Sequence, residues 1–215
     1  MKQLVIFDLD GTLLNTIGDL AASCDHILKS HDLPTHSYEE YSSFVGNGVM
    51  RLVERAIPEK MRSESFVAKL RAEFVAYYSE NISANTKIYN GILSLLFALE
   101  ERNIAVAVAS NKFHFGTSKL IRKFFPKTHF VAVIGQRPNV PLKPHPQIIY
   151  DVLNLGGFKP EDTLYVGDSG IDILTAAAAK IDSVGVTWGF RDRQELVEAG
   201  AKNIADTPLE ILKFL

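Results

Sequence analysis

The feature that most constrains the fold of this chain is a series of short, uninterrupted apolar runs. They span residues 4–7, 104–109, 130–134, 163–166 and 183–186. Runs that are apolar at consecutive positions suit strands that are covered on both faces. Segments with helical spacing lie between several of these runs, namely Ile92, Leu95, Leu96 and Leu99, and later Ile148, Ile149, Val152 and Leu153. This alternation predicts an α/β fold built on a doubly wound parallel sheet.

One stretch, from about Ile17 to Ser83, interrupts the alternation because it contains no convincing strand. Its apolar residues recur at helical spacings of three and four. They form two groups, Leu20, Cys24, Ile27 and Leu28, and Val67, Leu70, Phe74 and Tyr78. We therefore expect a helical cap over residues 17–83, inserted into an α/β core that is formed by residues 1–16 and 84–215.

Composition and charge exclude several classes of protein. The chain has 215 residues, of which 47% are hydrophobic and 22% charged, which is the balance of a globular protein. Its formal net charge of −2 provides no general basic field, so we expect no nucleic-acid partner. A single cysteine, Cys24, permits no intrachain disulfide, and no stretch is apolar enough for a signal-peptide core or a bilayer span. We therefore expect a soluble, cytoplasmic protein with no membrane partner.

Two acidic pairs follow apolar runs. Asp8 and Asp10 follow the first run, and Asp168 and Asp172 follow the run at 163–166. Residues two apart on an extended chain point the same way, so we expect Asp8 and Asp10 to face together. Ligands of open α/β sheets bind beyond the carboxyl ends of the strands, which predicts one shared site, although solvated turns and helix-end charges are the simpler alternative. Carboxylates without a Cys or His cluster suit Mg²⁺.

Uncharged and basic groups also follow apolar runs. Ser110 and Asn111 offer donors suited to phosphoryl oxygens, although the same pair is typical of a helix N-cap. Lys143 lies next to Pro144, so a stiff backbone could fix its charge beside a phosphoryl group; an exposed loop lysine is the alternative. A divalent cation beside a carboxylate nucleophile and a lysine would support phosphoryl transfer.

Taken in order, these motifs resemble those of the haloacid dehalogenase superfamily of phosphatases. The motifs are Asp8-x-Asp10-Gly11-Thr12, the strand-end Ser110, Lys143 with its proline neighbours, and Gly167-Asp168-x-x-x-Asp172. The resemblance implies a Rossmann-like core with an inserted helical cap of the C1 type. Residues 109–112 and 183–189 look most like the phosphoglycolate phosphatase branch.

The resemblance also implies roles for the acidic residues and the lysine. Asp8 would attack phosphorus and form an aspartyl-phosphate, and Asp10 would protonate the leaving oxygen and then activate water. Mg²⁺ would be held by Asp8, by the backbone carbonyl of Asp10 and by Asp168. Asp172 would support either the metal or Lys143 from slightly further out. Lys143 would offset the charge around the nucleophile.

The remaining roles concern substrate binding. Ser110 and Asn111 would hold the phosphoryl oxygens. Separately from the resemblance, we expect the cap loop at Gly46 and Asn47 to reach the site, where Arg51 or backbone N–H groups would meet a carboxylate of the substrate; an ordinary helix–helix connection with an exposed arginine is the alternative.

The sequence thus predicts a Mg²⁺-dependent phosphomonoesterase that acts on a small phosphorylated metabolite, with 2-phosphoglycolate as one candidate. A phosphosugar mutase or a pyrophosphatase on the same scaffold stays open. So does a non-catalytic binder of phosphorylated ligands, although binding alone would not need the Asp8 and Asp10 pair. The chain is expected to act as a monomer or a homodimer.

Overall fold

A computed structural model describes all residues from Met1 to Leu215. The chain divides into two compact units. The first is formed by residues 1–15 and 88–215, and the second by residues 16–87. No helix in either unit combines the length and the apolar character that crossing a bilayer requires.

The first unit is built on a six-stranded parallel sheet with the order β5-β4-β1-β6-β7-β8. Its strands are β1 (Leu4–Phe7), β4 (Ala105–Phe113), β5 (Phe130–Gln136), β6 (Thr163–Gly167), β7 (Asp182–Val186) and β8 (Ile204–Ala205). The N-terminal strand β1 lies between β4 and β6 and is buried at every position. This burial explains why its sequence is apolar without alternation.

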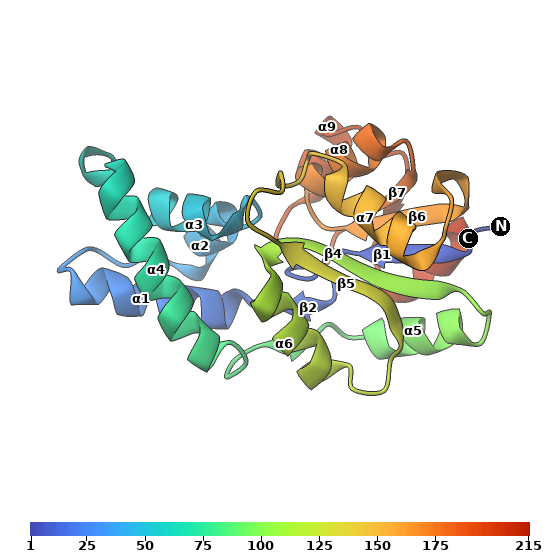
Figure 1. Ribbon diagram of the computed structural model, residues 1–215, viewed down its shortest axis with the longest axis horizontal. Helices are drawn as coiled ribbons and strands as arrows, with labels where there is room; N and C mark the ends of the chain where they lie inside the picture. The colour runs from blue at the N-terminus through green and yellow to red at the C-terminus, as the bar shows by residue number, and fades with distance from the viewer. The chain divides into compact units, whose positions relative to one another are not determined.

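Helices cover both faces of this sheet, as Figure 1 shows. The helices α5 (Ile92–Glu100) and α6 (His114–Phe124) lie on one face, and α7 (Gln147–Gly156) and α8 (Gly170–Ala179) on the other. The shorter α9 (Arg193–Glu198) packs beside α8, and the 3₁₀ segment η3 (Pro208–Phe214) packs against α5. A further 3₁₀ turn, η2 (Pro160–Asp162), precedes β6. The sheet is therefore doubly wound, and the predicted fold class is confirmed.

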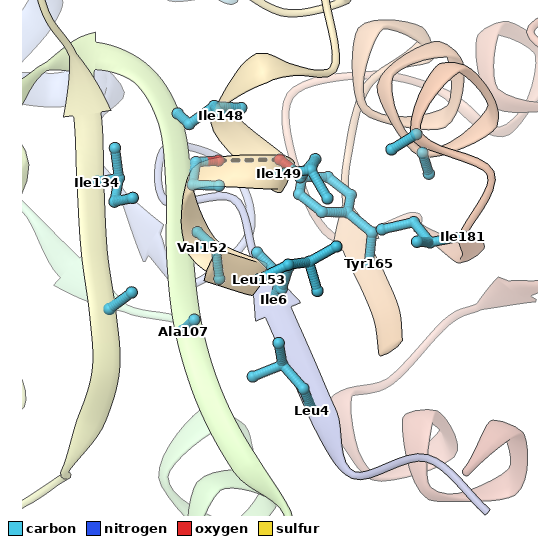
Figure 2. Packing of buried hydrophobic residues seen from close by; sticks show 14 residues of the cluster. Leu4, Ile6, Ala107, Ile134, Ile148, Ile149, Val152, Leu153, Tyr165 and Ile181 are labelled. Atoms are coloured by element: carbon cyan, nitrogen blue, oxygen red, sulfur yellow. Dashed lines mark hydrogen bonds between the residues drawn. The ribbon is translucent and has the colours of Figure 1, made fainter. Parts of the chain in front are cut away.

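The core between the sheet and helices α7 and α8 is apolar (Figure 2). Ile149 and Val152 of α7 are fully buried against Leu4 and Ile6 of β1 and their neighbours. Each such aliphatic side chain stabilises the fold by about 1.5–3 kcal/mol. Tyr165 of β6 also belongs to this core, but its hydroxyl donates a hydrogen bond to the carbonyl of Ala109 at 2.9 Å. The ring of Tyr165 thus links the core to the polar end of the strands.

The second unit is helical. It contains α1 (Ile17–Ser30), α2 (Tyr38–Phe44), α3 (Gly48–Ala56), the 3₁₀ turn η1 (Glu59–Met61) and α4 (Glu64–Asn81). The two apolar groups expected on helical faces are all buried, one on α1 and the other on α4. At the points where the chain leaves and re-enters the first unit, β2 (Leu14–Asn15) and β3 (Lys87–Ile88) form a two-stranded sheet.

The boundaries of the cap differ slightly from residues 17–83, because Asp19 ties the start of the insertion to its end. Its Oδ1 accepts hydrogen bonds from the backbone N and Nδ2 of Asn85, at 2.7 Å and 3.0 Å. Its Oδ2 accepts from the backbone N and the hydroxyl of Thr86, at 2.8 Å and 2.6 Å. Residues 84–87 consequently pack with the helical unit.

Candidate active site

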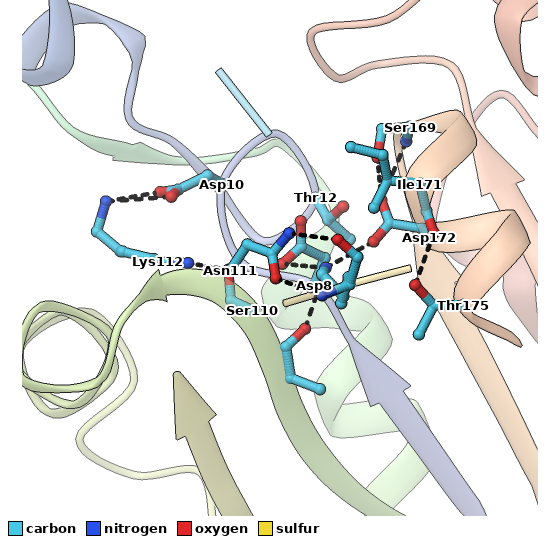
Figure 3. Close-up of polar contacts among 12 residues, drawn as sticks. Asp8, Asp10, Thr12, Ser110, Asn111, Lys112, Ser169, Ile171, Asp172 and Thr175 are labelled. Atoms are coloured by element: carbon cyan, nitrogen blue, oxygen red, sulfur yellow. Dashed lines mark hydrogen bonds and ion pairs between the residues drawn. The ribbon is translucent and has the colours of Figure 1, made fainter. Parts of the chain in front are cut away.

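The chemistry-bearing residues gather where the central strands end. Asp8 directly follows β1, with its backbone N donating to the carbonyl of Val166 at 2.9 Å. Asp168 directly follows β6, and Ser110 lies near the end of β4. Because these three strands are parallel neighbours, their carboxyl ends meet at one edge of the sheet (Figure 3).

Three buried carboxylates form the centre of this site. Asp8, Asp168 and Asp172 each place a carboxylate oxygen within 4.8 Å of the others. Their residues are 8%, 3% and 0% exposed. Such a group of carboxylates is destabilising unless cations or hydrogen-bond donors accompany it.

Lys143 supplies one buried positive charge to this group. Its Nζ lies 3.0 Å from Asp8 Oδ1 and 2.7 Å from Asp172 Oδ1. It also donates to the hydroxyl of Tyr165 at 2.9 Å and to the carbonyl of Ala109 at 3.3 Å. Burial lowers the pKa of Lys143, but the charges of Asp172 and Asp8 together outweigh burial and hold it well above its usual value. The lysine is therefore not the exposed loop residue of the simpler alternative.

Asp172 has both carboxylate oxygens engaged. Oδ1 accepts from Lys143 Nζ and lies 3.2 Å from the hydroxyl oxygen of Tyr165. Oδ2 accepts from the backbone N and the hydroxyl of Ser169, at 3.1 Å and 2.7 Å, in a capping box at the start of α8. These contacts tie the start of α8 to Lys143.

Burial dominates the acid–base properties of Asp8. Desolvation raises the pKa of its carboxyl to about 6 from a usual value of 3.8. The charge of Lys143 opposes this shift, while that of Asp172 adds to it, and a hydrogen bond from Ser110 lowers the pKa slightly. Desolvation, with the charges of Asp172 and Asp8, also raises the pKa of Asp168 well above its usual value.

The donor set fits a divalent cation. When ionised, the three carboxylates and the one ammonium of Lys143 leave an excess of two negative charges in a buried site. Asp8 Oδ1 is buried and accepts no hydrogen bond, so its contact with Lys143 Nζ at 3.0 Å is that of an ion pair alone. An all-oxygen site with an excess of two negative charges suits a hard divalent cation.

The loop after β7 closes around Asp168. The backbone N of Phe190 donates to Asp168 Oδ2 at 2.7 Å, and the hydroxyl of Thr12 donates to Oδ1 at 3.3 Å. Trp188 Nε1 donates to the carbonyl of Thr12 at 3.0 Å. Gly11 has a φ of +85°, and a Cβ there would lie 2.2 Å from Asp168 Oδ2. Glycine is therefore required at this turn for both its conformation and its lack of a side chain.

The side chains of Asp8 and Asp10 contact different lysines and do not face together, contrary to expectation. The two carboxylate oxygens of Asp10 accept from Lys112 Nζ, at 3.0 Å and 3.1 Å. Figure 3 shows its side chain turned away from Asp8 toward this lysine. The expected alternation fails because β1 ends at Phe7, so the chain is no longer an extended strand at Asp10.

Ser110 and Asn111 are not a helix N-cap. They lie within β4, which continues to Phe113, and α6 begins only at His114. Asn111 Oδ1 accepts from the backbone N of Lys143 at 2.8 Å, and its Nδ2 donates to the Lys143 carbonyl at 3.1 Å. The side chain of Asn111 thus fixes the backbone of the Lys143 loop.

The predicted cap residues lie around the start of α3. Gly46 precedes this helix with a φ of +112°, and Asn47 occupies its N-cap position. Arg51 is exposed on α3 and forms an ion pair with Glu54. A contact between these residues and a substrate stays a prediction.

Two site residues were missed in the sequence. Lys112 pairs with Asp10, and Tyr165 contacts both Lys143 and Asp172. Tyr165 lies within the apolar run at 163–166, and this pattern predicts only a buried strand residue. The signal for Lys112 was its position two residues after Ser110 at the end of an apolar strand, where a charge is costly unless it has a partner.

The fold and the site define a Rossmann-like α/β enzyme with a carboxylate site at its strand ends. The family model of haloacid dehalogenase-like hydrolases matches residues 5–186. The chain therefore belongs to the haloacid dehalogenase-like hydrolase family, as predicted from its motifs.

Curated relatives cover nearly the whole chain. A phosphoglycolate phosphatase of Haemophilus influenzae is 31% identical over 99% of this chain and 98% of its own length. One from Mesorhizobium japonicum is 32% identical over 89% of this chain and 86% of its own length. The chain is a phosphatase-type member of its family and is similar to this branch.

Solved structures agree with this relationship. A structure from Lactobacillus delbrueckii subsp. bulgaricus matches with a TM-score of 0.93 and 28% identity, covering 100% of this chain and 98% of its own. Another, described as a predicted phosphoglycolate phosphatase from Haemophilus somnus, has a TM-score of 0.89 and 30% identity, with coverage of 99% and 97%.

Proposed function

We propose that this protein is a divalent-metal-dependent phosphomonoesterase that uses Asp8 as its nucleophile. The observation that carries the proposal is the buried group of Asp8, Asp168 and Asp172 around a single ammonium, that of Lys143. The negative charges of this group exceed its one positive charge, so a phosphate dianion could approach only if further cations offset the repulsion.

The proposed reaction has two steps. A carboxylate oxygen of Asp8 forms a bond to phosphorus while the bond from phosphorus to the alcohol oxygen breaks, and Asp10 donates a proton to that oxygen. Water then attacks the phosphorus of the aspartyl-phosphate, Asp10 accepts the proton of this water, and Asp8 and inorganic phosphate are released. Lys143 offsets the negative charge beside Asp8, and the Ser110 hydroxyl and the Asn111 backbone N–H bind phosphoryl oxygens.

We propose Mg²⁺ as the metal, held by the carboxylates of Asp8 and Asp168 and by the backbone carbonyl of Asp10. Mg²⁺ would supply positive charge at the phosphoryl group. Asp172 would support Lys143 without contacting the metal, because its oxygens already accept hydrogen bonds from Lys143 and Ser169.

The expected activity is release of inorganic phosphate from p-nitrophenyl phosphate that depends on Mg²⁺ and stops when EDTA is added. Because Trp188 is the one tryptophan and hydrogen-bonds to Thr12 beside Asp168, its fluorescence gives a separate readout of metal binding. Among phosphorylated metabolites, 2-phosphoglycolate is the proposed substrate, since the curated relatives are named for it. Formation of an isomerised sugar phosphate without free phosphate would instead identify a mutase. Binding of Mg²⁺ without any turnover of p-nitrophenyl phosphate, 2-phosphoglycolate or other phosphorylated metabolites would contradict the proposal.

For substrate selection, we propose that Arg51 and the turn at Gly46 and Asn47 bind the carboxylate of phosphoglycolate. Arg51→Ala is then expected to raise the KM for phosphoglycolate about tenfold, because one charge-assisted contact of about 1.4 kcal/mol is lost. The KM for p-nitrophenyl phosphate, which has no carboxylate, should stay unchanged. Equal losses on both substrates would contradict this role for Arg51.

A further inference from the structure

Each aspartate of the first motif has a buried lysine of its own. Lys143 Nζ lies 3.0 Å from Asp8 Oδ1, whereas Lys112 Nζ lies 3.0 Å from Asp10 Oδ1. Both lysine side chains are only 2% exposed. The first of these ion pairs belongs to the mechanism proposed above, but the second has no role in it.

The position of Lys112 makes it suited to orienting Asp10. Lys112 belongs to β4, which is paired on one side with β1 and on the other with β5. Asp10 lies beyond the end of β1, directly before the turn that Gly11 begins, and forms an isolated β-bridge with Leu14. The contact with Lys112 therefore holds the side chain of Asp10 from β4, a different strand from the one that Asp10 follows.

The geometry of the ion pair restricts the carboxylate. Lys112 Nζ contacts both oxygens of Asp10, at 3.0 Å and 3.1 Å, so rotation of the carboxylate would weaken at least one contact. Burying an ammonium and a carboxylate is costly, and such a pair is often no more stabilising than apolar side chains of the same size. The presence of this ion pair beside a proton-transfer group is better explained by orientation of the carboxylate than by stability.

We infer that Lys112 is a positioning residue, which holds the Asp10 carboxylate in the orientation needed for proton transfer to and from the reacting groups. This inference rests on the proposed function of Asp10. In the first step the protonated carboxyl group of Asp10 gives its proton to the departing alcohol oxygen. In the second step the resulting carboxylate takes a proton from the attacking water. Loss of orientation would slow both transfers, and the first most strongly when the leaving oxygen is a strongly basic alkoxide.

Leaving-group dependence tests the inference. In Lys112→Met, kcat/KM for an alkyl phosphate that the wild type hydrolyses is expected to fall about 10- to 100-fold. The value for p-nitrophenyl phosphate should fall less than about threefold, because nitrophenolate leaves with little help from an acid. In the Asp10→Asn background, adding Lys112→Met should cause little further loss with either substrate, since the residue through which Lys112 acts is already disabled.

Lys127→Met is the matched control, because it removes the same charge from an exposed position of the first unit. Thermal unfolding of each variant distinguishes a loss of folded protein from a loss of rate. Equal losses on both substrates, or a full additional loss in the Asp10→Asn background, would assign Lys112 a merely structural role and overturn the inference. A wild type that releases no phosphate, or an Asp8→Asn variant that keeps its turnover, would instead overturn the proposed function.

Discussion

Replacing Asp8 by asparagine is expected to abolish phosphate release, with a loss on the order of 10⁴- to 10⁶-fold. The amide of asparagine cannot form the bond to phosphorus that a carboxylate forms. Asparagine has almost the same shape as aspartate, so the packing of β1 should be preserved. Steady-state phosphate release and circular dichroism of the purified variant check the two halves of this prediction. A folded variant with near-normal turnover would exclude Asp8 as the nucleophile.

The same variant should show a distinct dependence of stability on pH in the absence of metal. The pKa of Asp8 is raised to about 6 in the folded protein, mainly by burial. Between about pH 4 and pH 6, the folded carboxyl keeps a proton that the unfolded chain has already lost. This group therefore lowers the free energy of unfolding as the pH rises through that range. Asp8→Asn lacks this contribution, so denaturant unfolding with EDTA should show a shallower decline than in the wild type.

Replacing Lys143 by methionine is expected to reduce both stability and activity strongly. Methionine fills a similar volume, but Asp8 and Asp172 then remain buried without their ammonium partner. Removing one member of a buried ion pair costs about 3–5 kcal/mol, which corresponds to a fall in Tm of roughly 10 °C. Scanning calorimetry of the metal-free proteins measures this loss, and an unchanged Tm would contradict the assigned ion pairs.

The pH profile separates the catalytic part of this effect from the structural part. Lys143 lowers the pKa of Asp8, so its loss should move that pKa upward from about 6. Because the nucleophile must be ionised, the acidic limb of kcat/KM should move to higher pH. Adding Asp172→Asn should restore part of the stability by removing one uncompensated charge, but it should not restore turnover.

Much of the first unit could be predicted from the sequence because its strands are buried on both faces. The apolar run at 4–7 coincides with β1, and the run at 163–166 ends one residue before β6 does. Placing Asp8 and Asp168 directly after these strands required only the parallel arrangement of the sheet. The strands β2, β3 and β8 were not predicted, because two residues are too few to form a recognisable pattern.

The partners of the polar side chains could not be predicted in the same way. The orientation of Asp10 depends on where β1 ends, and the role of Lys112 depends on how far β4 extends beyond its apolar part. Likewise, the side-chain bonds of Asn111 to the Lys143 backbone connect residues that are 32 positions apart. Such contacts follow from tertiary packing, which local periodicity does not encode.

The central position of β1 has a consequence for synthesis of the protein on the ribosome. The nucleophile strand is made well before its two neighbours in the sheet, which begin at Ala105 and Thr163. Residues 16–87 contact mainly one another and can fold as soon as they leave the exit tunnel. The strand that carries Asp8 lacks one of its two neighbours until β6 has been translated, so its apolar side chains stay exposed after the whole of residues 16–87 has been made.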